Sequence, residues 1–308
     1  MIANCGYKGR FAPSPTGPLH FGSLLAAMAS YAEARAHGGE WLLRIEDIDP
    51  PRELPGATSD ILRTLERCGF EWDGDVVYQS VRGQLYESAL ARLGEAGLLF
   101  ACACTRREVA AAPISASAER VYPGQCRDRG LRLVEGYAWR VRVPDTEIVF
   151  TDALQGLQAQ QLAREVGDFV LRRADNLFAY QLAVVVDDAE QGITHVVRGS
   201  DLLASTARQI WLQRALGLPT PEYLHIPIAV NATGEKLSKQ TLAEPLPRDP
   251  LPALLAAWQF LGQRAPAQDI GSVGEFWAWA GTGWTRALLP PVPMLPLPRS
   301  QARSKNAL

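Results

Sequence analysis

Residues 10–23 hold the side chains and the spacing best suited to phosphate chemistry. A short strand-like start at residues 9–12 runs into a loop rich in proline and glycine, and an Ala- and Leu-rich helix follows from Ser23. A strand, a rigid loop and a helix N-terminus together form the arrangement that holds phosphates in open α/β sheets. His20 stands directly before the helix, and Gly22 lets a phosphate or a flat ring approach the backbone closely. Alone, the loop fits equally well a βα turn in which His20 only caps or packs.

A second polar segment, residues 235–240, carries two lysines on either side of a serine. Lys236 and Lys239 flank Ser238, far downstream of the first loop. Lysine is a mobile point charge that suits a polyphosphate. Such a segment is usually only a solvated loop, so its interest comes from its combination with residues 10–23.

Two charged side chains follow predicted strands of a parallel sheet. Residues 41–45 indicate a buried strand that ends in Glu46, and residues 195–197 indicate another that ends in Arg198. Ligands bind beyond the carboxyl ends of parallel strands, so both side chains are placed to meet a substrate. The charge of Glu46 suits an ammonium group, although a salt-bridged strand end is the alternative. Residues 168–173 and 178–186 are also predicted as strands.

The two loop segments together resemble the signature pair of class I aminoacyl-tRNA synthetases. Residues 18–23 stand where that family has His-Ile-Gly-His, and residues 236–240 stand where it has Lys-Met-Ser-Lys-Ser. Ser23 replaces the second histidine, while Leu237 and Gln240 depart from the second motif. The block at residues 44–53, Arg-Ile-Glu-Asp-Ile-Asp-Pro-Pro-Arg-Glu, narrows the resemblance to the glutamyl branch.

The resemblance implies a role for each matching residue. The catalytic positions are His20, Lys236 and Lys239, with the lysines and Mg²⁺ beside the leaving pyrophosphate. The ATP-binding positions are His20, Gly22, Ser23 and Lys239. The glutamate-binding positions are Arg10, Phe11, Ala12, Pro13, Ser14, Glu46, Tyr180 and Arg198. Two arginines for two carboxylates favour glutamate over glutamine, because an amide leaves a buried guanidinium partly unpaired.

The resemblance covers nearly the whole chain as a catalytic core, and it is closest to truncated paralogues of glutamyl-tRNA synthetase. It implies that ATP and glutamate form glutamyl-adenylate without RNA, and that glutamate then passes to queuosine at the wobble position of tRNA(Asp). About seventy residues follow the second motif, so we expect no full anticodon-binding domain. The alternatives are a minimal glutamyl- or glutaminyl-tRNA synthetase that charges the acceptor end, a non-catalytic tRNA-binding module and, less well supported, a small-molecule nucleotidyltransferase.

Three cysteines in the middle of the chain are spaced for a metal ion. Cys102, Cys104 and Cys126 can supply three thiolates to a tetrahedral zinc. The resembling family uses a tyrosine as the fourth ligand, and Tyr122 matches that position. Such a zinc would be structural, because no ligand position is left open. Three reduced thiols without a metal are the alternative.

The expected fold is a Rossmann-like α/β domain with a parallel sheet, built from residues 1–101 and 173–240. Residues 102–172 are predicted as an inserted subdomain of the type that contacts the tRNA acceptor end, with a half-exposed strand at 138–143 that presents Arg140 and Arg142 on one face. Residues 147–152 are expected to pair with that strand. Residues 241–308 are predicted as a short helical region, with helices at 251–262 and 273–280 and an extended Pro-rich tail whose last residues are disordered.

The bulk composition is that of an ordinary globular enzyme. The 308 residues are 47% hydrophobic and 21% charged, with a net charge of -2. No apolar run reaches membrane-spanning length and the first residues lack a secretory signal, so we expect a cytoplasmic protein that contacts no membrane. The net charge does not itself indicate nucleic acid. We expect a monomer.

Overall fold

The computed structural model describes residues 6–111, 120–231, 234 and 244–297. Lys236 and Lys239 lie outside the described residues, as do the last residues of the tail. Of the helices in the described ranges, none combines the length and the apolar character needed to cross a bilayer.

The first part of the chain alternates strands with helices, as a parallel sheet requires. Its elements are β1 (Lys8–Phe11), α1 (Phe21–Ala36), β2 (Glu40–Ile45), η1 (Pro50–Arg52), α2 (Ala57–Arg67), β3 (Val77–Tyr78), η2 (Gln79–Val81) and α3 (Gly83–Glu95). The strands β1, β2 and β3 pair in parallel in that order. The predicted strands at 9–12 and 41–45 and the helix after the loop are therefore confirmed.

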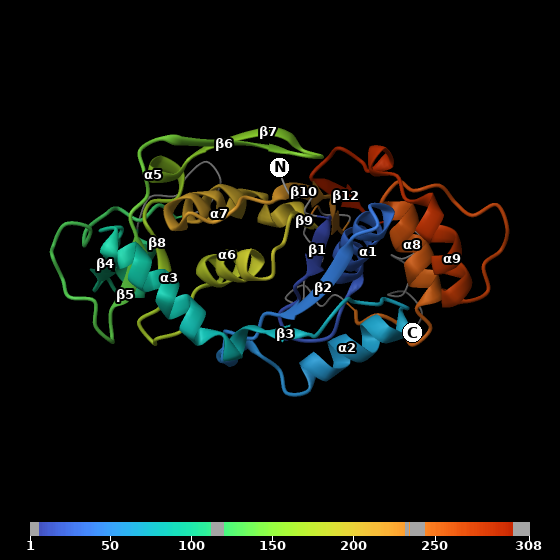
Figure 1. Ribbon diagram of the computed structural model, residues 1–308, viewed down its shortest axis with the longest axis horizontal. Coiled ribbons are helices and arrows are strands. Elements are labelled where there is room, and N and C mark those ends of the chain that lie inside the picture. Colours follow the sequence, from blue (N-terminus) through green and yellow to red (C-terminus); the bar gives the residue numbers. More distant parts are fainter. Residues whose placement is uncertain (1–5, 112–119, 232–233, 235–243, 298–308) are drawn as a thin grey trace.

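The parallel arrangement continues in the later part of the chain. Its elements are α6 (Tyr180–Glu190), β9 (His195–Gly199), η3 (Ser200–Leu202), α7 (Leu203–Leu216), β10 (Glu222–Ile226) and β11 (Ile228–Val230). β9 pairs with β10 in parallel, and the backbone N–H of Thr194 donates to the carbonyl of Lys8 at 2.9 Å. This bond joins β1 to the start of β9, so the carboxyl ends of strands from both halves of the chain meet on one side (Figure 1).

The middle of the chain forms a separate antiparallel sheet and a hairpin. Its elements are β4 (Leu99–Cys102), α4 (Arg106–Ala110), β5 (Ala138–Val141), β6 (Glu147–Asp152), β7 (Gly156–Gln161), α5 (Leu162–Glu165) and β8 (Phe169–Arg172). β5 lies between β4 and β8. The predicted pairing of residues 147–152 with the preceding strand is wrong, because β6 pairs with β7 and contacts β10 in parallel through Asp152 and Tyr223. The domain boundary predicted at residue 172 stays a prediction.

The strand predicted at residues 178–186 is also wrong, since residues 180–186 form the first part of helix α6. A run of leucine and valine is compatible with a buried strand or a buried helix, and packing decides between them. α6 is buried along Leu182 to Asp188, and the helix ends at Glu190, two residues before Gly192, which has a φ of 66°. Because the helix extends to Glu190, Asp187 and Asp188 are part of its buried face, where they reach the site described below.

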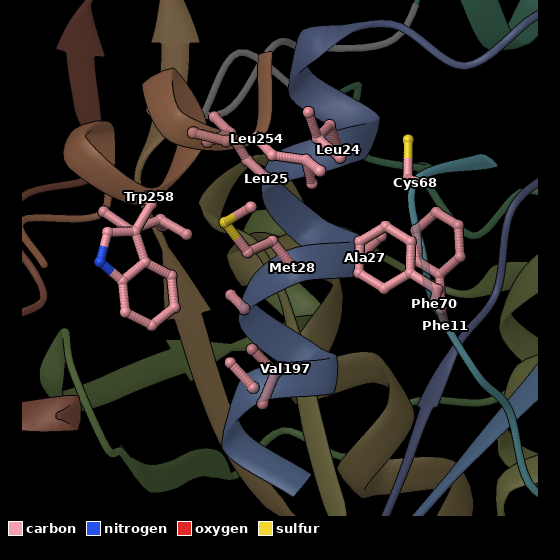
Figure 2. Packing of buried hydrophobic residues seen from close by; sticks show 14 of the residues in the cluster. Phe11, Leu24, Leu25, Ala27, Met28, Cys68, Phe70, Val197, Leu254 and Trp258 are labelled. Carbon is pink, nitrogen blue, oxygen red and sulfur yellow. The ribbon is translucent and has the colours of Figure 1, made fainter. Parts of the chain in front are cut away.

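Helix α1 forms the centre of the larger hydrophobic core. Leu24, Leu25 and Met28 pack among residues of the C-terminal helix α8 (Leu251–Phe260), including the buried Trp258 (Figure 2). The other C-terminal elements are α9 (Val273–Gly283), η5 (Arg286–Leu288) and β12 (Met294–Pro296). β12 pairs with β11 in parallel, so residues 294–296 of the Pro-rich tail lie extended against the parallel part of the fold.

Candidate functional site

A cavity of about 400 Å³ opens where β1, β2 and β9 end. All of the predicted glutamate- and ATP-binding residues that the structure describes line it: Arg10, Phe11, Ala12, Pro13, Ser14, His20, Gly22, Ser23, Glu46, Tyr180 and Arg198. In the first half of the chain they come from the ends of β1 and β2, the loop after β1 and the start of α1; in the second half they come from β9 and α6. The topology thus gathers at one place side chains that are far apart in the sequence.

His20 caps the helix that begins at this cavity. Its Nδ1 accepts the backbone N–H of Ser23 at 3.3 Å, so in the neutral ring the proton is on Nε2. The chain returns beside it at residues 245–246, where the N–H of Leu246 donates to the carbonyl of Leu19 at 3.0 Å. Residues 245–246 therefore lie next to His20, whereas Lys236 and Lys239, a few positions earlier in the sequence, lie outside the described residues.

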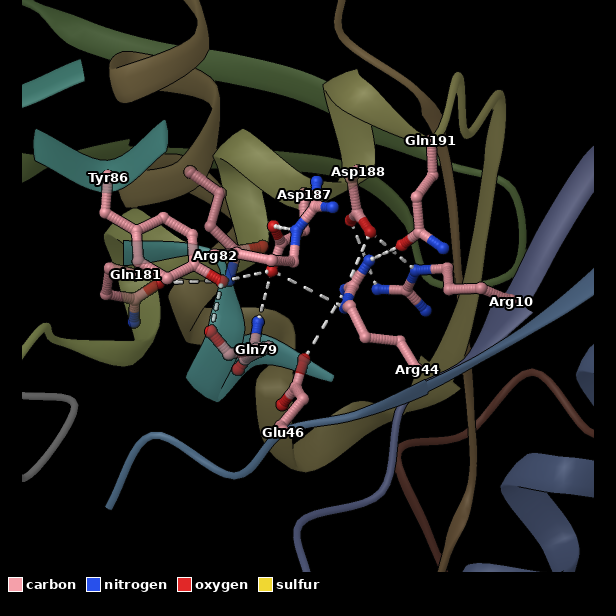
Figure 3. A network of polar contacts seen from close by, with 11 residues as sticks. Arg10, Arg44, Glu46, Gln79, Arg82, Tyr86, Gln181, Asp187, Asp188 and Gln191 are labelled. Carbon is pink, nitrogen blue, oxygen red and sulfur yellow. Dashed lines mark hydrogen bonds and ion pairs between the residues drawn. The ribbon is translucent and has the colours of Figure 1, made fainter. Parts of the chain in front are cut away.

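Arg10 is supported by a carboxylate of α6. Its Nε and Nη2 donate to the two oxygens of Asp188 at 3.1 and 3.3 Å, and both side chains are buried. Asp188 is also 2.8 Å from Nη2 of Arg44, which is fully buried. The same Arg44 atom donates to Glu46 at 3.4 Å (Figure 3). Arg44 therefore connects two residues predicted to bind the substrate: it contacts Glu46 directly and contacts Arg10 through Asp188.

The charges of this network set the protonation of its acids. Burial raises the pKa of Glu46 to about 6, although Arg44 and Arg10 oppose the rise. Burial acts in the same direction on Asp188, but there the two guanidinium groups prevail and hold its pKa below the ordinary value. Glu46 is thus ionised at neutral pH but close to its titration range.

A second aspartate of α6 extends the network away from the cavity. Asp187 is fully buried and accepts from Gln79 at 2.6 Å, Arg82 at 2.6 Å and Tyr86 at 2.8 Å. Its Oδ2 also lies 3.9 Å from Nε of Arg44. The elements η2, α3, β2 and α6 are joined at this point, which rigidifies the wall behind Glu46.

Arg198 has a support of a different kind. Its Nε donates to Nε2 of His225 at 2.9 Å and its Nη2 donates to Oγ1 of Thr206 at 3.0 Å. Within the described parts of the chain, no carboxylate forms an ion pair with it, and its buried Nη1 has no hydrogen-bond partner. These Nη1 donors are available to an anionic group in the cavity that Arg198 lines.

A smaller cavity of about 260 Å³ adjoins the first one. The two share Ser14, Thr16, Glu46 and Tyr180. Asp49, Arg52 and Arg173 give the second cavity a polar lining, and Arg173 forms a 3.2 Å ion pair with Asp49. Two ligands can therefore lie side by side with Glu46 between them.

The three predicted metal-binding thiols lie together. Within the residues that the structure describes, the sulfur atoms of Cys102, Cys104 and Cys126 are all within 4.8 Å of one another. The hydroxyl of Tyr122 is 3.3 Å from the sulfur of Cys102 and 3.8 Å from that of Cys104. Tetrahedral zinc with zinc–sulfur bonds of about 2.3 Å needs sulfurs about 3.8 Å apart, so this donor set fits the ion.

The basic strand face predicted on β5 is not a free surface. Arg140 is buried, donates to the carbonyl of Asp168 at 2.8 Å and lies over the ring of Tyr122 at 3.9 Å. Arg142 is bound to Asp128 at 2.8 Å and to the carbonyl of Arg127 at 2.5 Å. Both side chains hold the cysteine-containing loop to the sheet, because the loop folds back over this face. The predicted half-exposed basic face is therefore wrong for Arg140, which is buried, whereas Arg142 is partly exposed.

Residues 7–246 match the family model described as tRNA synthetases class I (E and Q), catalytic domain. The match spans the parallel strands, the cavity and the cysteine cluster. The chain belongs to this family. It is a ligase of the aminoacyl-tRNA synthetase type, with the α/β fold and parallel sheet of a class I synthetase catalytic domain.

Its curated relatives match this synthetase along nearly their whole length. It is 57% identical over 299 residues to the glutamyl-Q tRNA(Asp) synthetase of Dechloromonas aromatica, which covers 96% of this chain and 99% of the relative. It is 56% identical over 298 residues to the glutamyl-Q tRNA(Asp) synthetase of Chromobacterium violaceum, covering 96% and 100%.

Solved structures share the fold of this synthetase. The glutamate-tRNA synthetase from Elizabethkingia anophelis superposes with a TM-score of 0.80 at 24% identity, covering 96% of this chain and 69% of that one. A glutamate tRNA ligase from Elizabethkingia meningosepticum, solved in complex with its amino acid, gives a TM-score of 0.79 at 24% identity, covering 96% and 68%.

Proposed function

We propose that the protein activates glutamate with ATP, without RNA, and transfers it to queuosine at the wobble position of tRNA(Asp). The observation that carries this proposal is the single cavity lined by every described residue predicted to bind glutamate and ATP. The similarity to two glutamyl-Q tRNA(Asp) synthetases supports the choice of acceptor.

In the activation step a carboxylate oxygen of glutamate attacks the α-phosphorus of ATP, and pyrophosphate leaves as the bond to the β-phosphate breaks. Glu46 binds the ammonium group, Arg10 and Arg198 bind the carboxylates, and Tyr180 adds a hydroxyl contact. Such catalysis consists mainly of positioning and charge stabilisation.

The nucleotide lies at the beginning of α1. His20 donates from Nε2 to an α-phosphate oxygen, because its Nδ1 is occupied by the N–H of Ser23. The backbone N–H groups at the helix N-terminus donate to the phosphates, which can approach closely because Gly22 has no side chain. Lys236 and Lys239, with Mg²⁺, neutralise the departing pyrophosphate, as the family resemblance implies.

In the transfer step a hydroxyl of the cyclopentene diol attacks the activated carbonyl carbon and AMP leaves. The acceptor enters through the second cavity, which adjoins the first at Glu46 and Tyr180. Arg52 and Arg173 at its rim suit the phosphates that flank the acceptor nucleoside.

The cysteine cluster holds a structural zinc with Tyr122 as the fourth ligand. The sulfur spacing supports this, and such an ion would tie the loop to β4. Metal analysis of the purified protein is expected to find one zinc per chain and a large loss in Cys126→Ser; a metal-free, stably folded wild type contradicts it.

The second candidate function is charging of the tRNA acceptor end, because the fold is shared with glutamate-tRNA synthetases. Transfer of labelled glutamate to three RNAs separates the candidates: tRNA(Asp) with queuosine, the same RNA without it, and tRNA(Glu). We expect label on the first alone. Label on tRNA(Glu) instead would refute the proposal. Label on none would indicate a different acceptor if ATP–pyrophosphate exchange is intact, and a non-catalytic RNA-binding module if exchange is also absent.

A further inference from the structure

His225 lies directly behind Arg198 and takes no part in the chemistry proposed above. It is fully buried on β10, in register with Arg198 on the neighbouring parallel strand β9. Its ring lies between the Arg198 guanidinium and the carboxylate of Asp152, the last residue of β6. The three side chains therefore form a chain of contacts that ends at the cavity.

Asp152 at one ring nitrogen, and Arg198 together with the Thr206 hydroxyl at 3.3 Å at the other, determine where the proton of the ring lies. Nδ1 is 2.6 Å from Oδ2 of Asp152, whose oxygens also accept the backbone N–H groups of His225, Leu154 and Gln155. Nε2 is 2.9 Å from Nε of Arg198, and an arginine nitrogen can only donate. Nδ1 therefore donates and Nε2 accepts, which defines the neutral ring with its proton on Nδ1.

The surrounding charges favour this neutral form. Burial lowers the pKa of His225 to about 4, and Arg198 adds to the effect. Asp152 and Asp201 act in the opposite direction but do not prevail. A protonated ring would place an N–H donor against the N–H donor of Arg198, a repulsive arrangement.

The neutral ring fixes the guanidinium plane without an ion pair. Arg198 Nε is held by His225, and Nη2 is held by Thr206 and by the carbonyl of Leu202 at 3.4 Å. Only Nη1 is left without a hydrogen-bond partner among the described residues. A carboxylate in the place of His225 would neutralise the charge that a substrate anion needs.

We infer that His225 is a positioning residue that aims Arg198 at a substrate carboxylate and leaves the arginine charge to that substrate. The inference rests on the proposed activation of glutamate. It predicts that His225 affects the binding of glutamate and not the binding of ATP.

Kinetic variants test the inference in glutamate-dependent ATP–pyrophosphate exchange. His225→Leu removes the acceptor and is expected to raise the KM for glutamate by about tenfold or more, with the KM for ATP within about twofold. His225→Gln keeps an acceptor for Arg198 and is expected to stay within about threefold of wild type. His195→Gln is the matched control, because His195 lies at the opposite end of β9 and stacks on Tyr7. Equal impairment of the Leu and Gln variants, or a parallel rise in the KM for ATP, overturns the inference.

Two further measurements keep the test decisive. If the Leu variant does not fold, His225→Asn replaces it, since the shorter amide reaches Asp152 but not Arg198; an Asn variant as active as the Gln variant overturns the inference. In the wild type, ¹⁵N spectra of the His225 ring are expected to show the neutral Nδ1–H form from pH 8 to pH 5. A charged ring or an Nε2–H form at pH 7 overturns it. A wild type with this ring form but without glutamate-dependent exchange refutes the proposed function instead.

Discussion

The two arginines of the cavity have opposite electrostatic supports. Arg10 donates to Asp188, which is itself held by the buried Arg44, whereas Arg198 donates to a neutral imidazole. Both guanidinium groups are buried to a similar extent, at 4% and 5% exposure. The difference therefore lies in charge compensation and not in solvent access. On the Arg10 side, buried carboxylates are paired with buried arginines. On the Arg198 side, the buried guanidinium has no carboxylate partner among the described residues, so a bound ligand can neutralise its charge.

Loss of an arginine is therefore expected to affect folding differently on the two sides of the cavity, but to weaken substrate binding on both. Removing a base from the Arg10 side leaves buried carboxylates without a partner, which is costly for folding. Removing Arg198 leaves a neutral ring and hydroxyl, which is less costly. Loss of either arginine, however, removes one donor for a substrate carboxylate.

The largest effect is expected for Arg44, which contacts two acids of α6 and Glu46, the residue directly after β2. Arg44→Met leaves Asp187, Asp188 and Glu46 buried without this cation, and should cost about 3–5 kcal/mol of unfolding free energy in urea denaturation. The control is Arg63→Met, which breaks an exposed pair with Asp60 and should change the free energy by about 0.5 kcal/mol or less. A similar loss in both variants would contradict the difference between buried and exposed pairs.

The two arginines should then differ from each other in stability but not in activity. Arg10→Ala and Arg198→Ala should each lower kcat/KM for glutamate by about 100-fold or more, because each removes a charged hydrogen-bond donor in a buried site. Arg10→Ala should also unfold at the lower urea concentration, since Asp188 loses one of its two cations. Near-normal exchange in Arg10→Ala would show that Arg10 does not bind glutamate. Equal stability of the two variants would show that the two arginines do not differ in charge compensation.

The smallest effect is expected for the pH dependence of the KM for glutamate, which also distinguishes Glu46 on the Arg10 side from His225 on the Arg198 side. Glu46, with a pKa of about 6, loses its charge as the pH falls, while His225 stays neutral down to a pH of about 4. The KM for glutamate should therefore rise by about tenfold from pH 7 to pH 5, following protonation of one carboxylate. Glu46→Gln should have a high KM with little dependence on pH in this range. A wild-type KM that is constant from pH 7 to pH 5 would show that Glu46 does not bind the ammonium group in its charged form.

The charged residues that line the cavity could be predicted from the sequence in part, Arg10, Glu46 and Arg198 among them, but their supports could not. Glu46 and Arg198 follow predicted strands, and the carboxyl ends of parallel strands meet at one edge, so their proximity follows from the topology. Arg44 belongs to the block that narrows the resemblance, but no partner for it could be predicted from the sequence, because its partners on α6 are more than a hundred positions away.

The wrong assignment of residues 178–186 had a direct consequence for the site. As a strand, this segment would place Asp187 and Asp188 in a turn at its end; as part of α6, it places both aspartates in the buried network. His225 was missed because an isolated histidine in an apolar strand carries no signal of its own. Its pairing with Asp152 depends on contact between β6 and β10, which replaced the predicted pairing of β6.

The selection of glutamate by two guanidinium groups is tested most directly by ATP–pyrophosphate exchange of the wild-type protein without RNA, with glutamate and glutamine compared side by side. We expect glutamate to support exchange, and glutamine to be at least about 100-fold less effective in kcat/KM because its amide leaves a buried guanidinium partly unpaired. Equal exchange with glutamine, or exchange with glutamate only when RNA is present, would contradict it.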